Sequence, residues 1–208
     1  MTGEQHESYA CNDTLGSMYR RRSIRAFADR PVPEGHIMAV LRAANQAPSA
    51  HNQQSWRFIV VRGEKKKELA GLVTSRAAGF ARPASTLLRM AARSILGAPA
   101  VIAVANTGEL IARGTSLFKV DEEAGQDFFR TMEIQSSAAA VENLLVAAAS
   151  LGLATVWLGI LYLIKDQVLR FLVEGQGEFM AVVPIGYAAR TPAGPKKIPM
   201  EHLVRYLE

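Results

Sequence analysis

The feature that most constrains the fold is a long, alanine-rich segment at residues 128–151. Apolar side chains recur there every three or four residues, which predicts one helix with a wide apolar face. That face consists of Ile134, Ala138, Val141, Leu144, Leu145, Ala148 and Leu151. Because alanines permit close packing, we expect this helix at the centre of the fold. Gly152 follows it, where a helix terminator belongs.

Shorter apolar runs on both sides of this segment predict the strands of a sheet. They cover residues 56–61, 99–105, 154–158 and 179–187. Residues 56–61 carry apolar side chains on both faces, which favours a central strand. Together with the helices between them, these strands predict an α+β fold with a mixed sheet.

Several other segments have helical periodicity. Pro33 precedes a helix, since proline is favoured in a first turn, and Pro48 ends it. Its buried face is Ile37, Val40, Leu41 and Ala44. A short first helix is expected to end at residues 18–22. Further helices are expected at residues 65–73, 75–96 and 165–173.

Two segments lack a regular pattern. Residues 106–127 show no clear period, which predicts an irregular excursion or a mobile lid. Residues 188–208 contain three prolines, so we expect an extended tail that reaches a neighbouring subunit.

The length of 208 residues fits one domain. We expect a polar tail at residues 1–15 and a single domain over residues 16–208, with a lid or substrate region at residues 75–130. The hydrophobic content of 49% indicates a globular core, but no apolar run reaches the roughly 18 residues of a membrane span. The polar N-terminus and the single cysteine, Cys11, predict neither signal peptide nor disulfide, and therefore a cytoplasmic protein.

The net charge of +5 raises the question of nucleic-acid binding. The basic residues are spread along the chain, and no helix-turn-helix, ribonucleoprotein motif or zinc knuckle occurs. We therefore expect no nucleic-acid partner. A phosphorylated cofactor would offset part of the positive charge.

Side chains for covalent or metal chemistry are not evident. The four histidines lack metal-ligand spacing, and neither a Walker A sequence nor a GxSxG elbow is present. Gly175 and Gly177 begin like a dinucleotide fingerprint without its third glycine, so we interpret them as a turn. We predict no catalytic side chain and no metal; in an enzyme of this kind a cofactor carries the chemistry.

A cluster of hydrogen-bond donors marks where the phosphate of such a cofactor would bind. It consists of Arg21, Arg22, Ser23 and Arg25. Guanidinium groups pair bidentately with phosphate oxygens, and a serine hydroxyl adds a further hydrogen bond. In an extended segment Arg21, Ser23 and Arg25 would share one face. The alternative is a basic helix end with solvated arginines.

Four blocks of sequence, in order, resemble the FMN-dependent nitroreductase family. They are RRSIRAFADRPV with ANQAPSAHNQQSWRFIVV, ENLLVAAASLGLATVWLG, VVPIGY and PKKIPMEHLV. The resemblance spans residues 18–205 and implies a three-layer fold whose C-terminal strand is exchanged between the subunits of a homodimer, with FMN at the subunit interface. Residues 75–96 and 106–130 carry no signature of the family.

The resemblance also implies which residues hold FMN. They are Arg21, Arg22, Ser23, Arg25, Pro48, Ser49, Asn52, Gln54, Leu158, Gly159, Lys196 and Lys197. Pro48 and Ser49 would come from the other subunit, and Arg25 would place positive charge beside the flavin ring. Plain core packing is the alternative for Leu158. Lys197 stands where the family often has an arginine, with Lys196 as a nearby substitute.

The implied activity is a ping-pong reaction. NAD(P)H would reduce the flavin and leave, and a small electron-poor acceptor such as a nitroaromatic or a quinone would then be reduced. Two alternatives remain: a flavin-binding or storage protein without turnover, and a reductive dehalogenase or enone reductase of the same fold. A branch that destroys flavin is disfavoured, because the RRSIR pattern is intact.

Overall fold

The computed structural model describes residues 12–119, 121–173 and 177–207. Its elements are α2 (Asp13–Arg20), α3 (Glu34–Asn45), η1 (Ala50–Asn52), β1 (Trp56–Val61), α4 (Gly63–Ala77), α5 (Ala84–Gly97), β2 (Ala100–Asn106), α6 (Glu109–Phe118), α7 (Glu122–Ser150), β3 (Ala154–Thr155), η2 (Gly159–Ile164), α8 (Lys165–Phe171), β4 (Phe179–Gly186) and η3 (Met200–His202). The predicted polar tail falls outside the described residues as far as residue 11.

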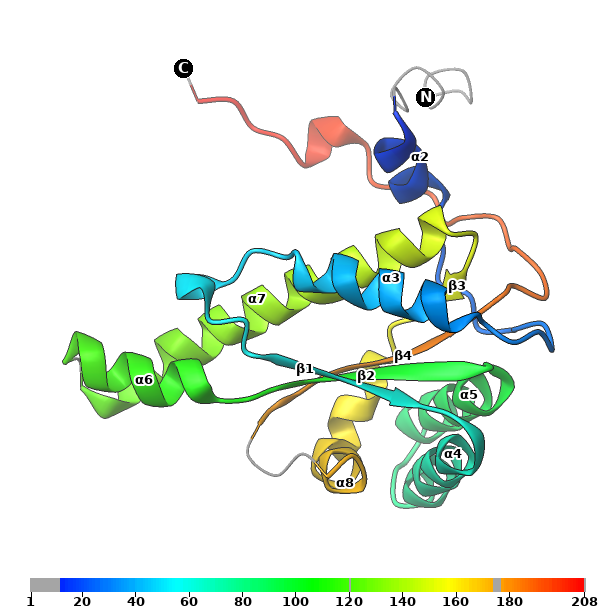
Figure 1. Ribbon diagram of the computed structural model, residues 1–208, viewed down its shortest axis with the longest axis horizontal. Coiled ribbons are helices and arrows are strands. Elements are labelled where there is room, and N and C mark those ends of the chain that lie inside the picture. Colours follow the sequence, from blue (N-terminus) through cyan, green and yellow to red (C-terminus); the bar gives the residue numbers. More distant parts are fainter. Residues whose placement is uncertain (1–11, 120, 174–176, 208) are drawn as a thin grey trace.

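A four-stranded sheet lies between two layers of helices (Figure 1). The strand order is β1-β2-β4-β3, and each neighbouring pair is antiparallel. The sheet is therefore antiparallel, not mixed as predicted. Among the described residues the parallel contribution is a single bridge, which joins Ser23 to Thr155.

Strand β2 sends alternate side chains into two separate cores, as the two-residue repeat of a strand requires. Val101 and Ala103 face the core formed with α4, α5, η2 and α8. Ile102 and Val104 face the core formed with α3 and α7. All four side chains are almost fully buried, so the three-layer architecture rests on both faces of β2.

The central helix begins earlier than predicted. α7 has 29 residues, because Asp121 accepts a hydrogen bond from the backbone N–H of Ala124 and caps it. Val141, Leu144, Leu145 and Ala148 are buried as expected, whereas Ile134, Ala138 and Leu151 are only partly buried. Gly152 follows with φ of 71°, the left-handed conformation of a helix terminator.

The prediction of a central strand at residues 56–61 is wrong. β1 has these bounds, but it lies at the edge of the sheet. Its apolar side chains do face both layers: Phe58 and Val60 pack on one core and Val61 lies in the other. Apolar residues on both faces of a strand therefore indicate that other elements pack above and below it. They do not show that the strand has a neighbouring strand on each side.

The prediction of an irregular excursion at residues 106–127 is also wrong. α6 and the first turns of α7 occupy most of it. The helical period of α6 is not visible in the sequence because a glycine, Gly114, occupies a buried position where an apolar side chain would normally stand. A Cβ there would overlap the ring of Phe129 on α7, so the glycine permits the two helices to pack closely.

The third strand differs from the prediction, whereas the C-terminal tail follows it. The third strand is confined to Ala154–Thr155, and the chain then passes into η2. As expected, the tail after residue 188 is extended, apart from the short helical turn η3. All of its described residues are exposed. Among the described residues, no helix combines the length and the apolar character that crossing a membrane requires.

Candidate functional site

The predicted phosphate-binding segment runs along the β3 edge of the sheet. Ile24 N donates to the carbonyl oxygen of Thr155 at 2.9 Å, next to the bridge between Ser23 and Thr155. Further along, the segment pairs with the start of the C-terminal tail, where Ala189 N donates to Ala26 O at 3.0 Å. These backbone contacts fix the segment beside β3 and then beside the chain that follows β4.

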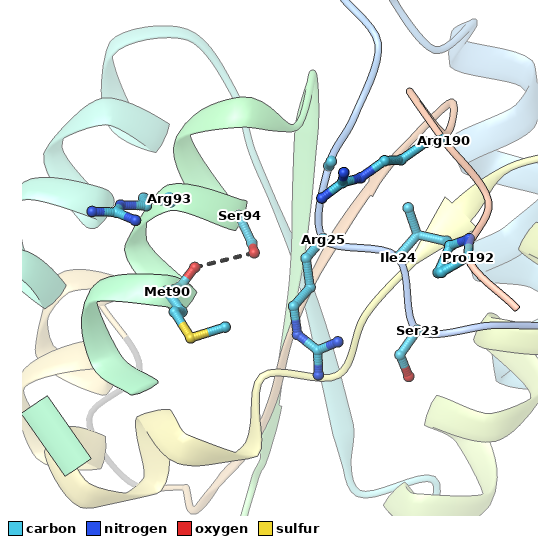
Figure 2. Close-up of a pocket in the computed structure, with 9 residues that line it drawn as sticks. Ser23, Ile24, Arg25, Met90, Arg93, Ser94, Arg190 and Pro192 are labelled. Carbon is cyan, nitrogen blue, oxygen red and sulfur yellow. Dashed lines mark hydrogen bonds between the residues drawn. The ribbon is translucent and has the colours of Figure 1, made fainter. Parts of the chain in front are cut away.

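A cavity of about 590 Å³ opens beside this segment. Ser23 and Arg25 line it together with Met90, Arg93 and Ser94 of α5 and Arg190 and Pro192 of the tail. Figure 2 shows the Arg25 side chain extending between Met90 and Ser23, with Arg190 entering from the tail and Arg93 turned away from both. The cavity has the size of a cofactor site.

The charge of this cavity is positive and unneutralised. Among the residues that the structure describes, no carboxylate oxygen lies within 4.0 Å of a side-chain nitrogen of Arg25, Arg93 or Arg190. Guanidinium groups without an internal partner, next to a serine hydroxyl, are suited to a phosphate. The donor set therefore fits a phosphorylated cofactor.

The other two arginines of the cluster make internal contacts instead. Arg21 Nε lies 3.7 Å from the Glu142 carboxylate on α7. Arg22 Nη1 donates to Tyr19 O at 2.6 Å and to Arg21 O at 2.8 Å. Ser23 and Arg25 are thus the members that the structure brings to the cavity.

The tail returns to the same cluster. A Cβ on Gly194 would overlap the Arg22 guanidinium, so the absence of a side chain lets the tail pass directly over it. Lys196 and Lys197 follow within three residues and are exposed. The tail therefore adds positive charge beside the segment that carries Arg22 and Arg25.

The two residues expected beside the flavin ring differ in what they offer. Leu158 is buried, and its backbone N–H already donates to Val182 O at 3.0 Å. Gly159 begins η2, is exposed and has open space where a Cβ would stand. Packing accounts for Leu158, and Gly159 is the member of the pair with free surface.

The second predicted segment, residues 48–54, forms a strained turn between α3 and β1. His51, Asn52 and Gln54 have φ of 52°, 51° and 52°, in the left-handed region that side chains other than glycine rarely adopt. Such conformations cluster at binding and catalytic sites, where the surroundings enforce them. Pro48, Asn52 and Gln54 are exposed, and the Gln54 amide donates to Asn52 Oδ1 at 3.0 Å.

Two serine hydroxyls hold this turn in place. Ser49 Oγ accepts from Gln54 N at 3.1 Å, which closes the turn from within. Ser136 Oγ on α7 accepts from Ala50 N at 3.1 Å, which fixes the turn to the central helix. Ser49, predicted as a flavin contact, therefore has a structural role within the chain.

A buried carboxyl one turn before Ser136 anchors the next element. Glu133 is 1% exposed and accepts from Leu110 N, in the first turn of α6, at 2.8 Å. It thus replaces the side-chain cap that Gly108 cannot provide. Burial raises the pKa of Glu133, and hydrogen bonds from the α6 backbone partly oppose this.

The two segments predicted to hold FMN, residues 21–25 and residues 48–54, lie apart in one chain. α3 has 12 residues and is therefore about 18 Å long; Figure 1 places residues 21–33 near its beginning and the turn of residues 48–54 beyond its end. In the described part of the chain no hydrogen bond or ion pair joins residues 21–25 to residues 48–54.

Two basic residues of the cavity, Arg93 and Arg190, were not predicted from the sequence. Arg93 is exposed on a helix whose period gives no sign of the cavity, so no local signal could have found it. Arg190 follows β4 by four residues, but its place depends on the pairing between Ala189 and Ala26.

Comparison with known proteins agrees with this geometry. The model of the nitroreductase family matches residues 18–187. The chain belongs to the nitroreductase family. A relative from Archaeoglobus fulgidus with the provisional name NADH dehydrogenase/NAD(P)H nitroreductase is 34% identical over 149 residues, which cover 71% of this chain and 68% of the relative. One from Methanothermobacter thermautotrophicus, provisionally named in the same way, is 32% identical over 86% of this chain and 80% of its own length.

Among solved structures, a provisionally named nitroreductase from Desulfovibrio desulfuricans in complex with FMN matches with a TM-score of 0.71. It is 25% identical, and the match covers 95% of this chain and 98% of that protein. The predicted family, its enzymatic character and the α+β nitroreductase fold are therefore confirmed.

Proposed function

We propose that this nitroreductase-family enzyme binds FMN and transfers electrons from NAD(P)H to a small electron-poor acceptor. The observation that carries the proposal is the cavity of about 590 Å³ with Ser23, Arg25 and Arg190 at its walls. The FMN held by the D. desulfuricans protein and the NAD(P)H in the names of the sequence relatives support it.

Residues that line the cavity and residues beside it would bind different parts of FMN. Arg22, Ser23 and Arg190, with Lys196 and Lys197, would hold the phosphate, and Arg21 would join them by leaving its exposed ion pair with Glu142, which contributes little stability. Arg25 would place positive charge beside the ring, where electrons collect. Gly159 would allow the ring to approach the backbone.

When bound, FMN would supply the redox chemistry, namely acceptance of a hydride from NAD(P)H and delivery of two electrons to an acceptor that also takes up protons. NAD(P)H and the acceptor would use the same exposed space in turn, as a ping-pong reaction requires. The chain's own residues bind the phosphate, orient the ring and set its electrostatic surroundings. Water is the proposed source of protons.

A second copy of the chain would complete the site. The turn of residues 48–54 lies apart from residues 21–33 in one chain (Figure 1). Its exposed Pro48, Asn52 and Gln54 could instead contact a flavin held by a partner, with Asn52 and Gln54 both donating and accepting at the polar edge of the ring. A homodimer with two shared FMN sites follows from this arrangement.

The test is the visible spectrum of the purified protein, followed by steady-state oxidation of NADH and NADPH with a quinone or a nitroaromatic. Absorbance bands near ~370 and ~450 nm are expected from bound oxidised flavin. Arg25→Ala should lose most of the FMN, whereas Arg205→Ala, in the exposed tail beyond η3, should keep it.

Two results would contradict the proposal. A yellow protein whose flavin NAD(P)H never reduces would favour flavin storage without turnover. A colourless protein that cannot be loaded with FMN would exclude the cofactor. Turnover of halogenated or enone acceptors in preference to nitroaromatics and quinones would identify the reductive alternatives of the same fold.

A further inference from the structure

A second cavity, of about 230 Å³, lies between the strained turn and α6. His51 and Gln53 of the turn line it on one side. Leu110, Arg113, Gly114 and Phe118 of α6 line it on the other. It shares its turn with Asn52 and Gln54, the proposed flavin contacts, so a molecule bound here would lie next to the FMN.

The α6 side of this cavity is apolar and firmly supported. Leu110 is buried, whereas Leu117 and Phe118 are 62% and 52% exposed. The Phe118 ring lies 5.5 Å from that of His51 and 5.4 Å from that of Phe129, measured between centroids. Exposed apolar side chains gathered at a hollow mark a binding surface, and the rings of Phe118 and His51, tilted at 57° to each other, offer aromatic faces and edges to a further ring.

The size of the cavity limits what it admits. A cavity of about 150 Å³ in another protein accommodates benzene. The larger space here, about 230 Å³, therefore accommodates one aromatic ring with one or two small substituents.

One cation at the rim lacks an anionic partner. The Glu109 carboxylate contacts Arg57 Nη2 at 3.5 Å and Gln53 Nε2 at 3.4 Å. Arg113 Nη1 donates only a long hydrogen bond, of 3.4 Å, to Gln53 Oε1. Within the described ranges no carboxylate oxygen lies within 4.0 Å of the Arg113 guanidinium.

We propose that this cavity binds a single-ring aromatic acceptor that carries an anionic substituent, such as a carboxylate. The ring would lie against Phe118 and His51, and Arg113 would pair with the anion and determine specificity. Gln53, which spans Glu109 and Arg113, would orient the guanidinium. This inference rests on the proposed function, because it assigns the acceptor of the same reaction.

Arg113 is tested by comparing 4-nitrobenzoate with its neutral methyl ester as acceptors in NAD(P)H oxidation. The ratio of kcat/KM for the acid to that for the ester should fall about fivefold in Arg113→Met, the size expected of an exposed ion pair. The loss should appear in KM, and added salt should reduce the wild-type preference. The matched control is Arg76→Met at the end of α4, which should keep the wild-type ratio.

Equilibrium dialysis of 4-nitrobenzoate against the FMN-loaded protein separates this inference from the proposed function. Binding that weakens in Arg113→Met, with no turnover of either compound, would support the cavity and overturn the proposed function. Turnover of both compounds with an unchanged ratio in Arg113→Met would overturn the inference and leave the proposed function intact.

Discussion

At the residue scale, Arg190 shows how backbone pairing between segments distant in sequence brings a side chain to a site. Ala188 bridges to Phe27, and Ala189 N donates to Ala26 O at 3.0 Å. This pairing turns the tail back along residues 22–27 and places Arg190 in the cavity that also contains Arg25. In the proposed FMN site both guanidinium groups would contact one ligand.

Arg190→Gln should weaken FMN binding by about tenfold, because a charge-assisted hydrogen bond to phosphate contributes roughly 1.5–3 kcal/mol. The measurement is titration of apo protein with FMN, followed by flavin fluorescence. Arg205→Gln, in the same tail beyond η3, serves as the control and should bind like the wild type. An unchanged dissociation constant in Arg190→Gln would remove this residue from the site.

At the element scale, α7 organises the site through polar residues in its first half. Glu133 anchors α6, and Ser136 anchors the strained turn. Ser137 Oγ, also buried, donates to Asn106 Oδ1 at the end of β2. The same helix therefore fixes three separate segments around the small cavity, and the close packing at Gly114 holds α6 against it.

Two glycine-to-alanine substitutions separate packing from helix propensity. Gly114→Ala should lower the free energy of unfolding by about 1–3 kcal/mol, because the methyl group meets the Phe129 ring in a filled space. Gly71→Ala, on the exposed face of α4 with nothing within 4 Å of the added Cβ, should raise it by about 0.5–1 kcal/mol. Urea unfolding measures both, and a stabilising Gly114→Ala would contradict the close contact of α6 and α7.

At the scale of the whole molecule, the C-terminal tail carries apolar side chains that the rest of the described chain leaves exposed. Ile198, Met200, Leu203 and Tyr206 are 62%, 56%, 61% and 84% exposed, and Figure 1 shows the last residues leading away from the body. Apolar side chains spaced along an exposed segment are typical of a protein–protein interface. The exposed tail and the separation of residues 21–25 from residues 48–54 both support the proposed homodimer.

The protein should therefore sediment as a dimer at submicromolar concentration. Replacing Leu203 and Tyr206 together with glutamate should produce monomers and reduce the FMN content, since charged groups cannot be buried in an apolar interface without a partner. Glu201→Gln, between them and Met200 in the same tail, should remain dimeric. A wild-type monomer that holds FMN stoichiometrically would contradict the shared site.

Much of the fold could be predicted because local patterns reflect local burial. The bounds of β1 and the terminator Gly152 follow directly from their sequences. The edge position of β1 could not, because its apolar faces report the helical layers and carry no information about neighbouring strands. α6 was missed because Gly114 serves the packing of Phe129, a contact that no periodicity within α6 reveals.

The same difference between local sequence patterns and tertiary contacts holds for the candidate site. The cluster of Arg21, Arg22, Ser23 and Arg25 and the family can be predicted from the sequence, since these are contiguous patterns. The tertiary structure shows that Ser23, Arg25 and Arg190 line one cavity, that Arg21 turns to Glu142 and that residues 21–25 and 48–54 lie apart in one chain. The physical reason is that backbone pairing and helix packing join segments distant in sequence, and their relative placement is not encoded in either segment alone.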